Sequence, residues 1–277
     1  MLSDNHIHMI LDGLEWRSAI ARHSTRVDIP WIRKQLDIYR TAGYTYLRDG
    51  GDKWGAGAAA RVLAPEYGIT YRTPLAPLCM EGHYGSFIGQ TWSDLNAYTA
   101  LVKSHREKGA DFIKIMISGL MDFDHFGVLT EPGLEERLIR ELVYIAHEEG
   151  FSVMAHANGA RTVEAAAAAG VDSVEHGAYL DKDALAAMKD SGTVWVPTLS
   201  TIGNLRGKGR FNEYAVEKIL DSALFNVSEF SSVGGLIAVG TDAGAWQVPH
   251  GSLTEEDYLQ MANADPTSGN AVIQTKF

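Results

Sequence analysis

Short apolar stretches alternate with longer amphipathic stretches along the whole chain. The apolar stretches predict strands at residues 2–8, 44–49, 70–78, 111–118, 151–156, 171–176, 194–198 and 236–242. The amphipathic stretches predict helices at residues 30–42, 56–66, 92–108, 132–149, 160–169, 181–191, 213–232 and 254–263. Strands and helices that alternate in this way predict an α/β fold, and their number predicts a (β/α)8 TIM barrel that forms one domain over residues 1–277.

Glycines support the boundaries of these units. Gly43, Gly109, Gly150, Gly170 and Gly192 each follow a helical pattern and precede an apolar stretch. A glycine at this place can adopt the left-handed conformation that ends a helix. The three longest irregular stretches, 10–29, 119–131 and 203–212, each follow a predicted strand, which in a barrel places them on the face where active sites are built.

Composition narrows the class of protein. The chain has 277 residues, a formal net charge of −11 and 45% hydrophobic residues, as expected of a globular protein with a substantial core. The acidic balance argues against nucleic acid or an anionic membrane as a partner, and no apolar run reaches the length of a membrane span. The single cysteine, Cys79, cannot form an internal disulfide, and residues 1–4 do not resemble a secretion signal. We therefore expect a cytoplasmic protein with a small-molecule partner, and a homo-oligomer is compatible with these features.

Two histidines lie in the first predicted strand. Side chains alternate along a strand, so His6 and His8 point to the same side while Ile7 points to the other. Two imidazoles placed in this way can bind one metal ion. Taken alone, such a pair is more often part of a solvated polar strand face than a metal site.

Lys114 is the one cation in the apolar stretch from Phe112 to Ile117. The isoleucines share one face, so Lys114 is expected to point into the barrel. Burial favours the neutral amine, which can react with carbon dioxide to give a carbamate able to bridge two cations. The simpler alternative is a lysine that extends to the barrel mouth or pairs with a carboxylate.

Three further polar residues stand at the ends of apolar strands. His156, His176 and Asp242 each close such a strand and are followed within a few residues by glycine. Singly, each is typical of a hydrogen-bonded core histidine or a helix-capping aspartate. Together with the first-strand histidines and Lys114 they are predicted to meet at one barrel mouth, where isolated charges are costly and coordinated ones are not.

This ordered set resembles the amidohydrolase superfamily. Its motifs include residues 43–51 (GYTYLRDGG), 112–119 (FIKIMISG), 173–177 (SVEHG) and 240–244 (GTDAG), which resemble the branch of imidazolonepropionase-like enzymes and Xaa-Pro or Xaa-Arg dipeptidases. The resemblance covers nearly the whole chain. It implies a metal-dependent hydrolase that acts on an amide bond. We expect the small β-sandwich usual in that family to be largely missing from these residues, and residues 266–277 are polar and do not predict the usual continuation of the last helix.

The resemblance also implies roles for the residues. His6, His8 and Asp242 would bind a first metal ion, and His156 and His176 a second. Lys114 would bridge both ions as a carbamate, which favours two divalent ions, with zinc expected, since mononuclear relatives lack this lysine. Asp242 would transfer the proton of the attacking water to the leaving amine.

Loop residues suggest how a substrate is bound. His83 and Tyr84 follow the third strand, and relatives of the family have a histidine near this position that contacts the scissile carbonyl. The resemblance implies this catalytic role for His83, although a histidine on the surface of a loop is an equally good interpretation. Arg206 and Arg210, with Lys208 between them, are candidates for binding a substrate carboxylate, although such a run is also typical of a solvated basic loop.

Tryptophans near strand ends suggest an apolar pocket. Trp54, Trp195 and Trp246 are candidates for its wall, although packing within the barrel explains any one of them equally well. The expected substrate is a dipeptide, an N-acyl amino acid or a cyclic imide.

Other functions are compatible with parts of the sequence. The same site would serve a lactone or other ester hydrolase, and a barrel that only binds a ligand is a further alternative. Residues 55–60 (GAGAAA) precede a helical pattern and resemble a dinucleotide-binding loop, which would indicate an NAD-dependent oxidoreductase. That interpretation leaves the ordered histidines, lysine and aspartate unexplained.

Overall fold

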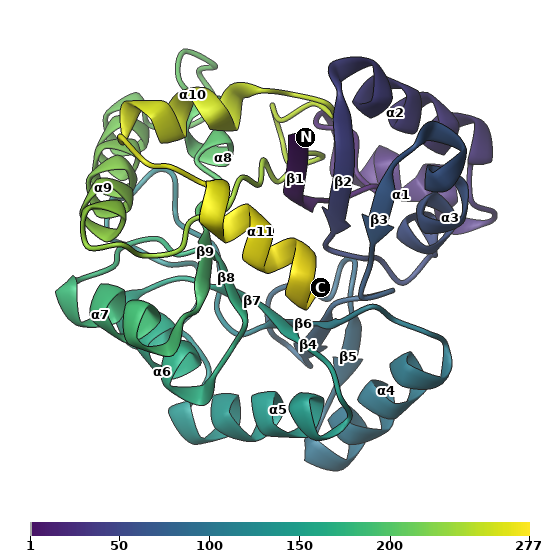
Figure 1. Cartoon of the computed structure of the whole chain (residues 1–277), viewed down its shortest axis with the longest axis horizontal. Coiled ribbons are helices and arrows are strands. Elements are labelled where there is room, and N and C mark those ends of the chain that lie inside the picture. Colours follow the sequence, from purple (N-terminus) through teal and green to yellow (C-terminus); the bar gives the residue numbers. More distant parts are fainter. Residues whose placement is uncertain (1) are drawn as a thin grey trace.

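The computed structural model describes residues 2–277 and contains two sheets in which every paired strand is parallel (Figure 1). The first sheet consists of β1 (Leu2–Ile7), β2 (Tyr44–Asp49) and β3 (Thr70–Arg72). The second has the order β5-β4-β6-β7-β8-β9, with β4 (Leu78–Met80), β5 (Gln90–Trp92), β6 (Ile113–Met116), β7 (Val153–Ala157), β8 (Ser173–His176) and β9 (Val194–Val196). The expected α/β fold with a parallel sheet is therefore confirmed.

Helices surround the strands (Figure 1). They are α1 (Trp16–Ser24), α2 (Ile29–Ala42), α3 (Ala56–Leu63), the 3-10 helix η1 (Ala64–Tyr67), α4 (Leu95–Glu107), α5 (Glu136–Glu148), α6 (Ala160–Ala169), α7 (Lys182–Ser191), α8 (Ser200–Gly203), α9 (Glu213–Ser232), α10 (Thr254–Met261) and α11 (Thr267–Lys276). Gly43, Gly170 and Gly192 end α2, α6 and α7 in the left-handed conformation, as predicted. The eight predicted helices are all present, with α3 continuing as η1.

The predicted strand 70–78 is wrong as a single element. It is divided into β3 and β4, which belong to different sheets. Pro74 and Pro77 lie between them and have no N–H group for a strand ladder, and Leu75 adopts a φ of 68°. The two sheets still meet here, because Asp111 N donates to Thr73 O at 3.0 Å.

The predicted strand 236–242 is also not a regular strand. It makes only an isolated bridge, between Ile237 and Trp195 of β9. Backbone hydrogen bonds nevertheless connect this segment to both sides: Ala238 N donates to Trp195 O, and Asn5 N of β1 donates to Val239 O, each at 2.9 Å. The segment therefore occupies the place of the eighth barrel strand between β9 and β1.

The C-terminal residues correct a further expectation. Residues 267–276 are polar in composition, yet they form α11, which lies across the centre of the ring of strands in Figure 1. Asn270 Oδ1 accepts hydrogen bonds from Val239 N at 2.9 Å and from Asn5 Nδ2 at 2.8 Å. Gly269 packs so closely on the backbone of Ile237 that a side chain would overlap it. The helix is thus fixed to the segment that replaces the eighth strand.

An apolar cluster fills the end of the barrel that α11 covers. Its buried members are Tyr46, Phe112, Met154, Val194, Val196, Ala238, Ile273 and Phe277. The Phe277 ring meets Phe112 edge to face with centroids 5.1 Å apart, so α11 and the residue after it cover this end of the barrel. An active site can therefore lie only at the opposite end of the barrel, at the carboxyl ends of the strands.

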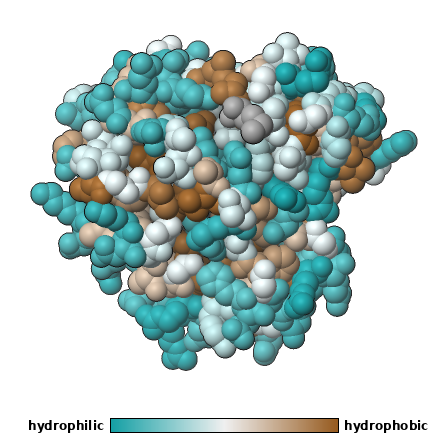
Figure 2. Space-filling model, viewed as in Figure 1, coloured by the Kyte–Doolittle hydropathy of each residue, from teal (hydrophilic) through white to brown (hydrophobic). Residues whose placement is uncertain are grey.

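The outer surface is mainly hydrophilic on the face seen in Figure 2, with hydrophobic atoms gathered in patches between the helices. Among residues 2–277, none of the helices combines the length and the apolar character that a membrane crossing requires. The described residues form no β-sandwich, since both sheets belong to the barrel.

His250 makes stability depend on pH. Its Nε2 donates to Leu11 O at 2.9 Å and its Nδ1 accepts from the Tyr39 hydroxyl at 3.0 Å. Burial lowers the pKa of His250 to about 4 from 6.5, although the Leu11 bond opposes the shift. The unfolded chain thus binds the proton first as the pH falls, so acidification to pH 5 should remove about 2 kcal/mol of stability through this residue.

The substitution His250→Gln tests this effect, because an amide can replace both hydrogen bonds without titrating near pH 5. Urea unfolding of wild type and variant at pH 7 and pH 5 gives the comparison. We expect the variant to lose less stability on acidification than wild type. Equal losses in the two proteins would contradict the role given to His250.

Candidate active site

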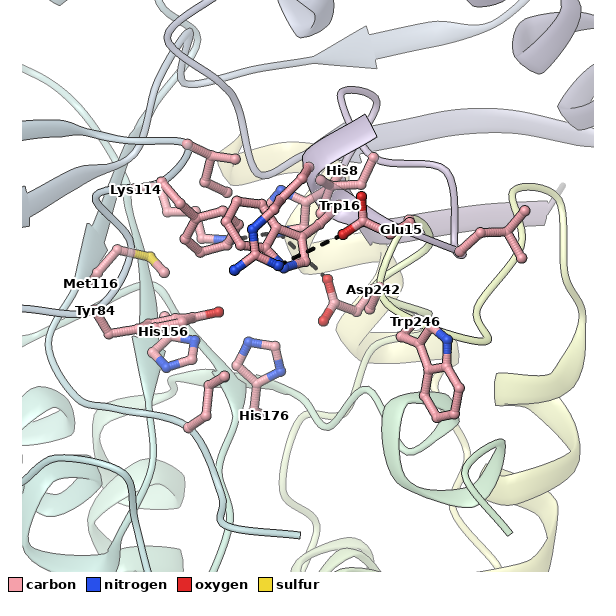
Figure 3. Close-up of a pocket in the computed structure, with 18 of the residues that line it drawn as sticks. His8, Glu15, Trp16, Tyr84, Lys114, Met116, His156, His176, Asp242 and Trp246 are labelled. Carbon is pink, nitrogen blue, oxygen red and sulfur yellow. Dashed lines mark hydrogen bonds and ion pairs between the residues drawn. The ribbon is translucent and has the colours of Figure 1, made fainter. Parts of the chain in front are cut away.

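Five of the six residues predicted as metal ligands lie together at the base of a pocket in Figure 3: His8, Lys114, His156, His176 and Asp242. His6 Nε2, His8 Nε2 and Asp242 Oδ1 form a triangle with sides of 3.4, 3.5 and 3.5 Å. His6 comes from β1, His8 follows it, and Asp242 ends the segment that replaces the eighth strand. Asp242 N donates to His6 O at 2.7 Å, which fixes these two chain segments side by side.

This donor set fits a divalent metal ion. Four ligands arranged tetrahedrally at the roughly 2.1 Å typical of zinc lie about 3.4 Å from one another. The triangle of His6, His8 and Asp242 therefore has the size of one face of such a shell. Burial, followed by the nearby Lys114, lowers the pKa of both histidines well below 6.5, so both rings are neutral and have a lone pair to offer.

His156 and His176 form a second pair of donors. Their ring centroids are 4.6 Å apart, and His176 lies 5.0 Å from the ring of His6. His156 Nε2 donates to Gly119 O at 3.1 Å, so the lone pair of Nδ1 is the one that can bind a metal ion. His176 Nδ1 forms a hydrogen bond with the Thr198 hydroxyl at 2.7 Å, so Nε2 is the nitrogen that can bind a metal ion. These contacts orient both rings from behind.

Lys114 points into the barrel, as predicted. Its Nζ lies 3.2 Å from His6 Nε2 and 3.4 Å from His8 Nε2, and the residue is 1% exposed. Burial lowers the pKa of the Lys114 ammonium, an effect that the Asp242 carboxylate opposes. Burial likewise raises the pKa of Asp242, opposed by Lys114. A buried amine surrounded by neutral imidazoles has the reactivity that the carbamate requires.

Glycines and unusual backbone angles make room for this cluster. A side chain at Gly50 would overlap the His8 ring, and one at Gly240 would lie 2.9 Å from His6 Cβ. His176, Thr198 and Asp242 have φ values of 70°, 49° and 59°. Non-glycine residues in this left-handed region are strained, and such strain concentrates at functional sites.

A cavity of about 510 Å³ opens from the cluster. His8, Lys114, His156, His176 and Asp242 lie at its base, and its walls are mainly apolar and aromatic. The apolar and aromatic wall residues are Leu11, Leu14, Trp16, Tyr84, Phe87, Ile88, Met116, Leu120, Ala245 and Trp246. A smaller space of about 200 Å³ shares His176, Asp242 and Trp246 and adds Met121, Phe123, Leu205 and Phe211. The volume of the larger cavity is typical of small-molecule sites.

The structure places Tyr84, but not His83, on the cavity. His83 Nδ1 lies 2.9 Å from Glu131 Oε2, and His83 does not line the cavity. The Tyr84 ring packs against His156 with centroids 4.9 Å apart, and Figure 3 shows it beside the histidine pair. His83 forms the turn after β4, in which its N–H donates to Met80 O, and this turn directs the next residue inward.

Of the two arginines predicted to bind a substrate carboxylate, one lies at the site and the other does not. Arg206 is paired with Glu217 at 2.7 Å on the surface and lines neither space of the site. Arg210 lines both spaces, and its guanidinium lies 4.5 Å from the centroid of Trp246 and 5.2 Å from that of Phe211. Of the two candidates for a substrate carboxylate, only Arg210 is therefore placed to reach one.

Only one of the three tryptophans expected to line the pocket does so. Trp246 lines both spaces of the site, whereas Trp54 and Trp195 lie outside them, and Trp195 belongs to the core. A different tryptophan, Trp16, forms part of the wall instead. It lies in α1, within a stretch predicted to be irregular.

Two residues behind the candidate ligands have no clear sequence signal. Glu175 lies 2.7 Å from His6 Nδ1, and Arg48 NH2 donates to Glu175 at 2.7 Å. Both residues occur within the motifs 43–51 and 173–177, but nothing in their spacing predicts this contact.

Comparison with known proteins gives the family. The model of the amidohydrolase family matches residues 75–269, which is more than half of the chain. The chain therefore belongs to the amidohydrolase family, as the sequence motifs predict. It is 28% identical over 179 residues to ochratoxinase of Aspergillus niger, a match that covers 59% of this chain and 37% of that protein.

A second relative is an uncharacterized protein of Mycobacterium tuberculosis, 30% identical over 131 residues, or 45% of this chain and 35% of the relative. The chain thus matches about a third of the length of these curated relatives. Among solved structures, a Xaa-Pro dipeptidase with bound methionine has a TM-score of 0.75 at 21% identity, covering 99% of this chain and 72% of that one. Aspergillus niger ochratoxinase has a TM-score of 0.77 at 19% identity, covering 99% and 69%. These structures share the fold.

Proposed function

We propose that this protein is a binuclear metal-dependent hydrolase that cleaves an amide bond in a small substrate. The observation that carries the proposal is the convergence of His6, His8, Asp242 and Lys114 with a second histidine pair at the base of an aromatic cavity. Five separate chain segments contribute these side chains. Neutral imidazoles and a buried amine at one point are costly to maintain without a bound partner.

Each ligand has a definite place in the proposal. His6, His8 and Asp242 hold one divalent ion, with zinc favoured by the nitrogen-rich donor set and the size of the triangle. The second pair, His156 and His176, holds the other. Lys114 carries a carbamate between the two groups.

When bound, divalent ions lower the pKa of water and polarise a substrate carbonyl. Asp242 Oδ1 faces His6 and His8. The other oxygen, Oδ2, can therefore accept a proton from the attacking water and transfer it to the leaving amine. Tyr84, packed on His156, forms the wall beside the reacting group. The apolar walls exclude bulk water, which strengthens every charge interaction at the base of the cavity.

The shape of the cavity suggests the substrate class. The larger and the smaller space meet at His176, Asp242 and Trp246, so a scissile bond at this junction has room for an apolar group on each side. Arg210 stands at the same junction and can bind a carboxylate. An N-acyl amino acid or dipeptide with bulky apolar groups fits these features. The fold shared with a Xaa-Pro dipeptidase and an ochratoxinase supports an amide substrate.

A substrate screen tests this function. Protein loaded with zinc is incubated with dipeptides, N-acyl amino acids, cyclic imides and lactones, and hydrolysis is measured for each class. We expect the highest kcat/KM for amides that have an apolar acyl group and a free carboxylate. Activity confined to lactones or esters, or none in any class, would contradict the proposal.

The substitution Arg210→Gln tests the carboxylate contact. We expect the KM for an acidic substrate to rise about tenfold to a hundredfold, because a charge-assisted hydrogen bond contributes about 1.5–3 kcal/mol. The same substrate with an amidated carboxylate should be hydrolysed equally by variant and wild type. Arg206→Gln is the matched control, since Arg206 is exposed and paired with Glu217. A KM unchanged in Arg210→Gln, or raised equally in both variants, would remove Arg210 from the proposal.

A further inference from the structure

A buried ion pair lies directly behind the first metal ligand. Glu175, on β8, is fully buried, and its Oε2 is 2.7 Å from His6 Nδ1. Its other oxygen, Oε1, accepts from Arg48 NH2 at 2.7 Å and from the Ser173 hydroxyl. Both carboxylate oxygens are therefore occupied, and only one of them faces the imidazole.

Arg48 is itself held rigidly. Its Nε donates to Asn5 O at 2.7 Å and its NH1 donates to the Ser173 hydroxyl at 2.9 Å. Its guanidinium lies 4.5 Å from the ring centroid of Phe277, the residue that follows α11. Burial raises the pKa of Glu175, and the charge of Arg48, which is protonated at any accessible pH, opposes this shift together with the Ser173 hydroxyl. Both groups that contact Oε1 are donors that favour the carboxylate form, and a carboxylate can only accept a hydrogen bond.

We infer that Glu175, held by Arg48, is a positioning residue that fixes His6 as the Nδ1–H tautomer and thereby sets the metal affinity of the His6, His8 and Asp242 site. A neutral imidazole has one ring hydrogen. If Nδ1–H is donated to Glu175, the lone pair of Nε2 points to Asp242 and His8. In the other tautomer Nε2–H occupies the place of the metal, and His6 cannot act as a ligand.

The neighbouring ligand shows why this contact is specific. His8 Nδ1 is buried and, among residues 2–277, has no hydrogen-bond partner. His6 is therefore the one member of the first-strand pair whose Nδ1 contacts a charged side chain. A carboxylate behind a metal-bound imidazole also increases the basicity of the ligand.

The substitution Glu175→Gln is expected to reverse the tautomer. Arg48 has only donors, so it attracts the amide oxygen of the new side chain and turns the amide nitrogen toward His6. His6 Nδ1 must then accept, and the ring hydrogen moves to Nε2. We expect the affinity for zinc to fall about tenfold to a hundredfold, the usual effect of losing such a partner.

Two measurements without substrate test the inference. Ring ¹⁵N NMR of the metal-free wild type should show His6 protonated at Nδ1, and the variant should show it protonated at Nε2. Zinc titration gives the affinities, and thermal unfolding of the metal-free proteins shows whether the variant remains folded. Glu255→Gln is the matched control, because Glu255 is equally buried but accepts its hydrogen bonds from Leu199 N and Ser200 N. It should leave the His6 tautomer and the zinc affinity unchanged.

The inference rests on the metal site of the proposed function, but its failure is distinguishable. Nε2–H at His6 in wild type overturns it even if Glu175→Gln does not fold, and so does a folded variant with wild-type zinc affinity. A wild-type protein that binds no zinc, with His6 protonated at Nδ1, contradicts the proposed function and the affinity part of the inference, while the tautomer assignment stands.

Discussion

Replacing Asp242 with asparagine is expected to lower kcat/KM by about 10³-fold, within the range typical of losing a positioned acid–base group. Asparagine keeps the shape of the side chain but cannot accept and return a proton. Activity is measured at saturating zinc on the best substrate of the screen, and metal content is determined on the same samples. A variant that keeps its metal and loses its activity shows that the carboxylate transfers protons as well as binding the metal.

Glu15→Gln is the control for this experiment. Glu15 also lines the cavity, but it lies near Arg17 at the N-terminus of α1, where its carboxylate accepts from Ser18 N. We expect its activity to stay within a few-fold of wild type. If Asp242→Asn retained most of the wild-type activity, Asp242 would not be the proton-transferring group.

Replacing Lys114 with methionine should remove the bridge between the two groups of ligands. We expect the variant to lose at least one ion and nearly all activity, and the increase in melting temperature on adding zinc should shrink. Without metal, the variant should be as stable as wild type or more so, because an apolar side chain of similar length replaces a buried amine. Calorimetry with and without zinc measures both effects.

Mass spectrometry of the intact wild type examines the carbamate itself. Under mild conditions it should show a fraction heavier by one carbon dioxide, and this fraction should be absent from Lys114→Met. If the variant retained two ions per chain, Lys114 would not be a bridging ligand.

The places of the candidate ligands are predictable because they follow from general rules. In a parallel barrel, a polar residue at the carboxyl end of a strand faces the common mouth, so the apolar strands before His156, His176 and Asp242 identify these residues. The alternation of β1 places His6 and His8 together. The Ile-Lys-Ile pattern of β6 directs Lys114 inward.

Other features depend on contacts that are distant in sequence. The helix α11 is polar in composition, and its docking relies on a few positions such as Asn270 and Ile273 that local patterns do not reveal. The break between β3 and β4 has a signal in Pro74 and Pro77, but the apolar residues around them outweigh it in a strand prediction. The eighth strand pairs irregularly, which a run of apolar residues cannot indicate.

The substrate-binding residues are the hardest to predict. Neighbours in a loop can point in opposite directions, so His83 turns to Glu131 while Tyr84 lines the cavity. Arg206 and Arg210 lie in one basic run, and only the tertiary partners distinguish them. Glu175 is visible as part of a motif, but its contact with His6 joins residues 169 positions apart.

Metal analysis of the purified protein tests the central claim most directly. Protein expressed with ample zinc and dialysed against metal-free buffer is examined by elemental analysis. The account predicts about two zinc ions per chain in wild type and a clear loss in a variant with His6 and His8 both replaced by alanine. A wild-type count near zero would contradict the account.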